Sequence, residues 1–453
     1  MHHFSSRARL LLLSLPCLLW LTGLLGALAS PAAAELRAGA AVADITPPIG
    51  TPSAGYGDRL GAGMTGVHDP LLATALALDN GVERLVFVGV DHLGFDHGMV
   101  QEVATRLSAQ DARPVELFLG SSHTHAGGGA YLDVPVVGEV LAGKFDPAAR
   151  QLYVDGAARA AIEAVAGLQP ARIGLTHGEA PALNRYRGDW PPNVSTRPDL
   201  MVIKVTTVGG EPLAVLFDYA AHATVLPGAN REFSADFVGF ARQAIQARLG
   251  AGTVAVYFNG AQGDVSPASP GPETEEPFAR ARSMGGALAA QVLELWAQAE
   301  TSERLEIAVA RLPYQLDVQP TSTGIELPID ERETEIGLVV LDRVHALLAV
   351  PGELSTIYDA DLERFASWLG YRDLTILGLT NDAHGYIITP ESWRHRTYES
   401  TVSFGGELYG ERVESLAQAL LHQLEPAGAY QEQRAVPSAL LGDSPAAPAG
   451  APP

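Results

Sequence analysis

The feature of this 453-residue sequence that most constrains its fold is an alternation of short apolar runs with longer helical patterns. The apolar runs have the composition of β-strands and lie at 84–91, 115–120, 212–220, 253–260, 344–353 and 374–380. The helical patterns lie near 99–108, 147–167, 235–249, 278–298, 359–369 and 405–424. Weaker runs at 172–176, 200–208 and 306–314 are typical of edge or antiparallel strands. The sequence therefore predicts an α/β fold in which helices flank a mixed β-sheet core.

Residues 1–34 have the features of an export signal. Arg7 and Arg9 precede an apolar run from Leu10 to Ala29, and "SPAAAE" fits cleavage after Ala34. The run is about 20 residues long, so an uncleaved membrane anchor is the alternative, although the Ala-x-Ala ending favours cleavage. We expect an extracytoplasmic protein, secreted or periplasmic, after cleavage near Ala34.

The remainder of the chain is predicted to form one large domain followed by a tail. Strand-like and helical patterns continue from residue 35 to about residue 425 without an evident linker. Residues 426–453 are rich in proline and alanine, a composition that does not support a packed core. We therefore expect a single domain over 35–425 and a disordered C-terminal tail.

Charge and cysteine content limit the partners and the ligands of any metal. Residues 1–34 contain two of the 30 basic residues and none of the 52 acidic ones, so the formal charge changes from −22 to −24 on cleavage. A surface this acidic repels nucleic acid, which we exclude as a partner, and nothing in the sequence indicates a protein partner. The only cysteine, Cys17, lies within the signal. Any metal must therefore be held by histidine, carboxylate or tyrosine.

The stretch "GSSHTHAGGGAY" places two histidines directly after the apolar run 115–120. If the extended backbone continues past that run, His123 and His125 point to the same side of the chain. Gly127 to Gly129 remove side chains just beyond them, which allows a ligand or another segment to approach closely. The pattern fits either a solvated loop or a metal or catalytic site.

Other polar residues also follow the apolar runs. They are Asp91, His92, His222, Asp264, Ser266 and Glu353. Ligands of open α/β sheets collect outside the carboxyl ends of the strands, so one site at that edge would gather all of them. For each single residue, a helix cap, a solvated loop or a hydrogen-bonded histidine is the alternative.

Several motifs occur in a specific order along the chain. They are "ADITPPIG" at 43–50, "GVHDPLLATALAL" at 66–78, "SSHTHAGGG" at 121–129, "NR" at 184–185, "NGAQGDVSP" at 259–267, "VPGEL" at 350–354 and "TNDAHGYIITPESWRHRTYE" at 380–399. In this combination the sequence resembles the neutral ceramidase family, the neutral or alkaline non-lysosomal ceramidases. These are zinc amidases that cleave the N-acyl bond of ceramide. The resemblance covers roughly Ala38 to Leu424 and corresponds to the family's N-terminal catalytic domain only.

The resemblance implies a zinc (Zn²⁺) site. Its ligands fall on His123, His222, Glu353 and Tyr386 of this sequence. Two imidazoles and a carboxylate leave zinc an open position at which a water is activated for attack on an amide carbonyl.

The resemblance also implies four further site residues. His125 would hydrogen-bond the substrate or protonate the departing amine, and the phenol of Tyr398 would stabilise the oxyanion. Arg185 matches the family's site arginine. Ser266 matches a serine of the "GDVSP" stretch, and its role is either that of a nucleophile or that of a hydrogen-bonding group.

Together these features predict an exported zinc-dependent amidohydrolase that acts on ceramide, another N-acyl lipid or a related small molecule, with transient contact with a membrane surface. One alternative is a metal hydrolase of the same fold that cleaves a different amide or an ester. Another is an extracytoplasmic binding protein without turnover. The glycine stretch departs from the family at Gly128, where a proline is usual.

Overall fold

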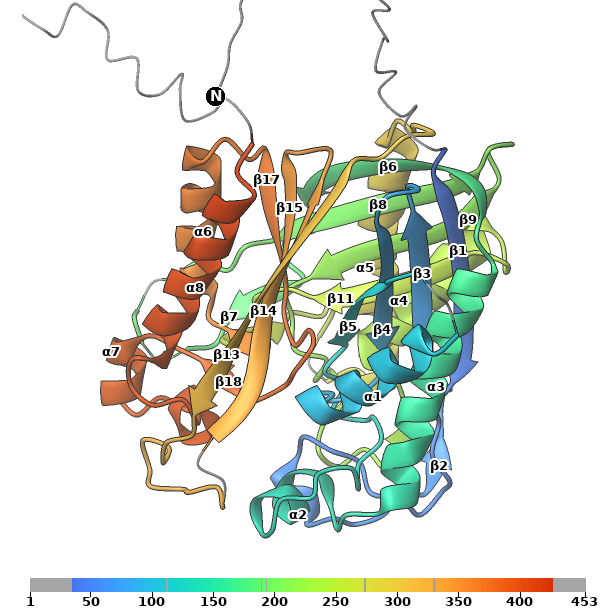
Figure 1. Ribbon diagram of the computed structural model, residues 1–453. Helices are drawn as coiled ribbons and strands as arrows, with labels where there is room; N and C mark the ends of the chain where they lie inside the picture. Colours follow the sequence, from blue (N-terminus) through green and yellow to red (C-terminus); the bar gives the residue numbers. More distant parts are fainter. Residues whose placement is uncertain are drawn as a thin grey trace, which may run out of the picture. The chain divides into compact units, whose positions relative to one another are not determined.

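The computed structural model describes residues 35–426 apart from 111–112, 189, 193, 273 and 329–330 (Figure 1). The predicted export signal lies outside the described residues, as does the predicted tail from residue 427 onward. The described residues belong to one compact unit. No helix among them is long and apolar enough to cross a membrane.

The larger of two main sheets has eight strands in the order β11-β9-β8-β6-β1-β3-β4-β5. Their bounds are β1 Arg37–Asp44, β3 Leu72–Asp79, β4 Arg84–Val90, β5 Glu116–Ser121, β6 Gln169–Glu179, β8 Asp199–Thr207, β9 Pro212–Tyr219 and β11 Val254–Asn259. The pairs β4–β5 and β9–β11 are parallel, and the other neighbours are antiparallel. The prediction of a mixed sheet is confirmed.

The second sheet has four strands in the order β13-β14-β15-β17. They are β13 Ile307–Asp317, β14 Glu331–Leu341, β15 His345–Ala349 and β17 Asp373–Leu377. Only β15 and β17 run parallel. One core cluster joins both sheets, because Phe87, Phe118 and Ile203 of the larger sheet pack in it with Val339 and Leu347 of the smaller one.

Helices cover the outer faces of both sheets (Figure 1). They are α1 His97–Ser108, α2 Val137–Ala142, α3 Pro147–Ala166, α4 Asp236–Leu249, α5 Pro277–Gln298, α6 Thr356–Trp368, α7 Pro390–Arg394 and α8 Tyr409–Gln423. Helix α3 packs on β1 and β3, and α5 packs on β6 and β8, whereas α6 and α8 pack against the smaller sheet. The six predicted helices are all present. The short helices α2 and α7 were not predicted.

Strand β3 shows why strands of the larger sheet carry apolar side chains on both faces. Alternate side chains of a strand point to opposite faces, and here both faces are covered. Ala75 and Ala77 belong to the core cluster that includes residues of α1 and α3. Leu76 and Leu78 belong to the cluster shared with the smaller sheet.

The larger sheet curls, so that β11 at one edge packs across β3, β4 and β5 at the other. Gly89 on β4 permits this approach, because a Cβ at that position would lie 2.5 Å from the Tyr257 carbonyl oxygen of β11. The side chain of Asn259, at the end of β11, donates to the Ser122 carbonyl just after β5 at 3.1 Å. The curl therefore brings the carboxyl ends of β5, β9 and β11 together.

Three pairs of short strands complete the structure. They are β2 Gly66–Val67 with β10 Glu232–Phe233, β7 Asn184–Tyr186 with β12 Val265–Pro267, and β16 Glu353–Leu354 with β18 Tyr386–Ile387. Two single-turn 3₁₀ helices lie at Gly57–Arg59 and Glu399–Val402. The last two strand pairs carry four of the eight residues expected in the site, Arg185, Ser266, Glu353 and Tyr386.

Candidate metal centre

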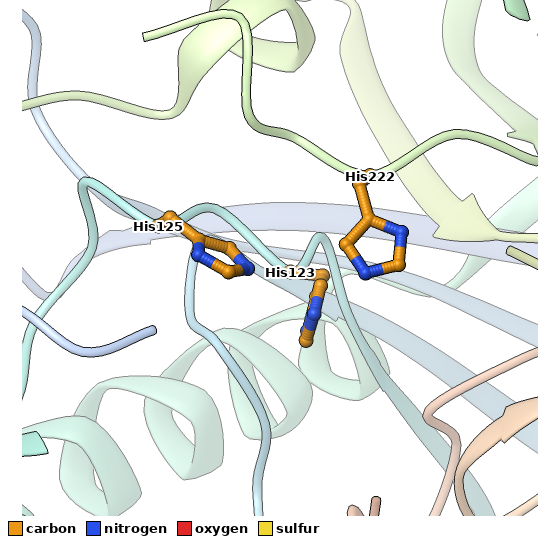
Figure 2. Close-up of side chains that lie close together, drawn as sticks. All are labelled: His123, His125 and His222. Atoms are coloured by element: carbon orange, nitrogen blue, oxygen red, sulfur yellow. The ribbon is translucent and has the colours of Figure 1, made fainter. Parts of the chain in front are cut away.

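Three histidines converge at the carboxyl ends of the curled sheet (Figure 2). His123 and His125 follow β5, and His222 follows β9. A nitrogen from each ring lies within 4.8 Å of one from each of the other two. The ring centroid of His123 is 4.9 Å from that of His125 and 4.8 Å from that of His222. The structure thus brings together residues that are almost 100 positions apart in the chain.

The backbone fixes which nitrogen of His123 and His222 faces the site. The Nδ1 of His123 lies 2.8 Å from the Leu93 carbonyl oxygen, and the Nδ1 of His222 lies 3.0 Å from the Val265 carbonyl oxygen. A carbonyl only accepts, so each Nδ1 carries a hydrogen and each Nε2 of the neutral ring keeps its lone pair. This arrangement orients metal-ligating histidines in other proteins.

His123 itself has an unusual backbone conformation. Its φ is 61°, in the left-handed region that non-glycine residues rarely adopt. Its amide donates to the His92 carbonyl at 2.9 Å, which helps to hold the conformation. Such strain is found most often at functional sites.

The carboxylate of Glu353 completes a three-atom donor set. Its Oε2 lies 3.3 Å from the Nε2 of His123 and 3.0 Å from the Nε2 of His222. The carboxylate is buried, and Gln262 donates to the same oxygen at 3.2 Å. Burial, followed by the charge of Arg187, lowers the pKa of His222 to about 3, so its ring is neutral near pH 7. Two nitrogen lone pairs and a carboxylate oxygen that face one another are a suitable donor set for a divalent cation such as zinc.

Tyr386 lies beside these three residues. Its hydroxyl is 3.3 Å from the Nε2 of His222, and its main chain pairs in register with Glu353. Burial, followed by the charge of Glu353, raises the pKa of the Tyr386 phenol well above its usual range. All four residues expected as metal ligands are therefore gathered in one place, and their role as ligands remains a prediction.

The arginine that contacts the cluster is Arg187, whereas Arg185 was the arginine expected there. One guanidinium nitrogen of Arg187 donates to the Tyr386 hydroxyl at 2.9 Å and to the Gly263 carbonyl at 2.9 Å, and it lies 3.0 Å from the Nε2 of His222. Its Nε pairs with Glu399 at 3.3 Å. Arg185 lies on β7 with an exposed side chain. The segment "NRYR" contains both arginines, and only Arg185 was expected in the site from the sequence.

His125 lies at the cavity with both ring nitrogens unused. Neither Nδ1 nor Nε2 has a hydrogen-bond partner among the described residues. Burial lowers its pKa well below the usual range, and the neighbouring rings of His123 and His222 lower it further. Gly55 packs over the ring with a φ of 99°, and a Cβ there would lie 2.4 Å from Nδ1. A neutral imidazole with two free polar atoms is available to a ligand.

Tyr398 and Ser266 occupy different surroundings. Tyr398 is 60% exposed, lines the cavity and has its ring centroid 6.3 Å from that of Tyr386. Ser266 is half-buried on β12, opposite Arg185 in the ladder, and is not among the described residues that line the cavity. Tyr398 is thus placed to meet a ligand directly, whereas Ser266 is not.

Asp91 and His92 also follow a strand but have structural roles. The carboxylate of Asp91 is fully buried and pairs with both terminal nitrogens of Arg242. The ring of His92 is fully buried against Phe95 and Tyr131. Of the residues at the strand ends, these two therefore do not join the histidine cluster.

The cluster lies at the polar end of a cavity of about 140 Å³. Most of its lining is apolar, formed by Leu93, Tyr131, Leu132, Val134, Val137, Leu141, Leu316, Val318, Leu327, Val402 and Phe404. Gly128 packs closely against Tyr153, because a Cβ at this position would lie 2.2 Å from the Tyr153 hydroxyl. That hydroxyl donates a hydrogen bond to the Gly129 carbonyl at 3.0 Å. A proline in place of Gly128 would therefore clash with Tyr153.

The fold is similar to that of solved ceramidase structures. The crystal structure of neutral ceramidase from Pseudomonas aeruginosa matches with a TM-score of 0.78 at 20% identity, over 86% of this chain and 75% of that one. A structure described as ceramidase complexed with C2 matches with a TM-score of 0.74 at 18% identity, over 88% of this chain and 76% of that one. Residues 36–287, more than half of the chain, match the model of the neutral/alkaline non-lysosomal ceramidase N-terminal region. The chain therefore belongs to the neutral/alkaline non-lysosomal ceramidase family.

Proposed function

We propose that this protein is a zinc-dependent amidohydrolase that cleaves the N-acyl bond of ceramide or a related N-acyl lipid. Its family and fold support a ceramidase-like hydrolase. The observation that carries the finer proposal is the placement of the Nε2 atoms of His123 and His222 within 3.3 Å of a Glu353 carboxylate oxygen, at the end of an apolar cavity.

His123, His222, Glu353 and Tyr386 would hold the metal. When bound there, zinc would polarise the amide carbonyl and activate a water for attack. The donor set supports this assignment, because each Nε2 lone pair is directed by a backbone hydrogen bond on the other ring nitrogen. In the proposed complex, the guanidinium of Arg187 holds the Tyr386 hydroxyl in place.

The remaining site residues would move protons and stabilise charge. His125 is neutral and has two unpartnered nitrogens, so one can accept a proton and pass it to the departing amine. The phenol of Tyr398 donates a hydrogen bond to the oxygen that becomes negative in the tetrahedral intermediate. Ser266 would require a base to act as a nucleophile, and no described histidine forms a hydrogen bond with it. We assign it a supporting role.

The apolar lining favours a substrate with a hydrocarbon chain. Near the cavity, Leu60, Val136 and Val140 are 81%, 72% and 46% exposed, and Val136 directly precedes α2, which supplies part of the wall. We propose that these side chains make transient contact with a lipid surface. The acidic chain favours a zwitterionic surface over an anionic one.

Export remains part of the proposal on the basis of residues 1–34. N-terminal sequencing of the native protein should find Glu35 as the first residue. Retention of the segment from Leu10 to Ala29 would instead indicate a membrane anchor.

A substrate panel tests the reaction class. Wild-type protein should release fatty acid from a short-chain fluorescent ceramide and fail to cleave the matching ester at a comparable rate. Preference for the ester, or for an amide without an acyl chain, would favour the alternative hydrolase. Saturable binding of the ceramide without product would favour a binding protein.

A further inference from the structure

A second group of candidate metal ligands lies away from the first. It consists of His177 on β6, His345 on β15 and Asp373 on β17. His345 and Asp373 are the first residues of parallel strands and face each other in register. Glu353 follows the opposite end of β15, so the two clusters lie at opposite ends of the smaller sheet.

The geometry of this cluster is close to that of a coordination site. The Oδ2 of Asp373 lies 2.8 Å from the Nδ1 of His345 and 3.3 Å from the Nδ1 of His177. The three ligand atoms all lie within 4.8 Å of one another. Ligand atoms that share one tetrahedral zinc, each about 2.0–2.2 Å from it, are separated by roughly 3.3 Å.

The surroundings bury and orient the cluster. The side chains of His345, Asp373 and His177 are only 13%, 18% and 28% exposed. The Nε2 of His177 lies 3.2 Å from the Thr375 hydroxyl. If Nδ1 binds a metal, Nε2 carries the hydrogen and donates it to Thr375. This is the usual outer hydrogen bond of a metal-ligating histidine.

A cavity of about 110 Å³ adjoins the cluster. His177, Asp373, Asp218 and Asp359 are among its lining residues. Asp218 is 7% exposed, and burial raises its pKa well above the usual range. This cavity gives an ion access to two of the three candidate ligands, His177 and Asp373.

We propose that His177, His345 and Asp373 bind a second divalent metal ion of the zinc class, which ties β6 of the larger sheet to β15 and β17 of the smaller one. Two imidazoles and one carboxylate are a donor set typical of zinc, whereas calcium and magnesium prefer sites made of oxygen ligands. The role is structural, because the site lies at the end of the sheet remote from the apolar cavity.

Zinc stoichiometry tests the site. Metal-stripped full-length protein is titrated with zinc alone, and bound metal is measured by elemental analysis and calorimetry. Wild type should bind two zinc ions per chain. His345→Ala and Asp373→Asn should each bind one, His222→Ala should bind one, and the His222→Ala/His345→Ala double variant should bind none. Asp361→Asn, which changes an aspartate outside both clusters, should bind two.

Thermal denaturation gives a second readout. Zinc should raise the Tm of His222→Ala but not that of the double variant, because binding to the folded state alone stabilises it. If His345→Ala does not fold, as judged by circular dichroism, Asp373→Asn decides the result, since it keeps the shape of the side chain.

The outcomes separate the two sites. Two zinc ions in a folded Asp373→Asn variant would overturn the proposal, as would a single zinc in wild type that His222→Ala removes. In that case the cluster is a metal-free network of hydrogen bonds. A single zinc in wild type that Asp373→Asn removes, and His222→Ala leaves, would support this site and contradict the candidate metal centre.

Discussion

Glu353 and Tyr386 are direct partners in the two-residue parallel ladder of β16 and β18. The Glu353 amide donates to the Gly385 carbonyl at 3.0 Å, and the Ser355 amide donates to the Ile387 carbonyl at 3.0 Å. Main-chain hydrogen bonds therefore set the position of the carboxylate relative to the phenol. The site is preorganised by the backbone rather than by mobile loops.

Removing the Tyr386 hydroxyl should weaken the metal site without unfolding the protein. Tyr386→Phe loses the contacts with the Nε2 of His222 and with Arg187, so we expect zinc affinity at this site to fall by about 10–100-fold. Calorimetric titration measures the change. Tyr358→Phe is the matched control, because its hydroxyl makes only a 3.4 Å contact with the Ile388 carbonyl. Equal affinities in both variants would contradict the assignment of Tyr386.

The two arginines of "NRYR" should differ sharply. Arg187→Ala removes the donor to Tyr386 and leaves the buried Glu399 without its partner, so kcat/KM for a short-chain ceramide should fall by about 10²-fold or more. Arg185→Ala removes an exposed side chain and should change kcat/KM less than about twofold. A larger loss of kcat/KM in Arg185→Ala than in Arg187→Ala would identify Arg185 as the site residue.

The alternation of apolar runs and helical patterns was sufficient to predict most of the fold. The helix expected at 278–298 is Pro277–Gln298, and the strand expected at 212–220 is Pro212–Tyr219. Strand β1, "RAGAAVAD", was not predicted, because alanine and glycine have low β-propensity. Pairing with β3 and β6 stabilises it in the sheet.

The site was less predictable than the fold. Strand-end placement and family resemblance indicated His123, His222 and Glu353, and these do lie together. The choice between Arg185 and Arg187 depends on which one faces Tyr386, about 200 residues later in the sequence. The cluster of His177, His345 and Asp373 was not predicted either, because it forms only when the two sheets pack.

Gly55 should be needed for the position of His125. Gly55→Ala places a Cβ 2.4 Å from the Nδ1 of His125 and strains a φ of 99°, so both kcat/KM and the Tm should fall. Gly50→Ala has the same φ of 99° with nothing within 4 Å of the new Cβ, and it should lose stability only. Strain of this kind costs about 1–3 kcal/mol. If the two variants have the same kcat/KM, His125 is not positioned by this contact.

Ser266→Ala should retain measurable turnover. Ser266 lies on β12 outside the cavity lining, so its loss should disturb nearby hydrogen bonds rather than remove the nucleophile. Mass spectrometry of enzyme quenched during turnover should show no covalent acyl group. An acyl group trapped on Ser266 would establish a serine nucleophile and leave the amidase assignment intact.

The most direct test of the central claim is hydrolysis of a short-chain fluorescent ceramide by metal-stripped protein before and after addition of zinc. We predict that wild type is inactive when stripped and recovers its full rate with zinc, whereas His222→Ala stays at the rate of buffer alone. His222→Ala should remain folded by circular dichroism, so that loss of the ligand is the only change. Full activity of the stripped wild type, or recovery of a folded His222→Ala on addition of zinc, would contradict the account.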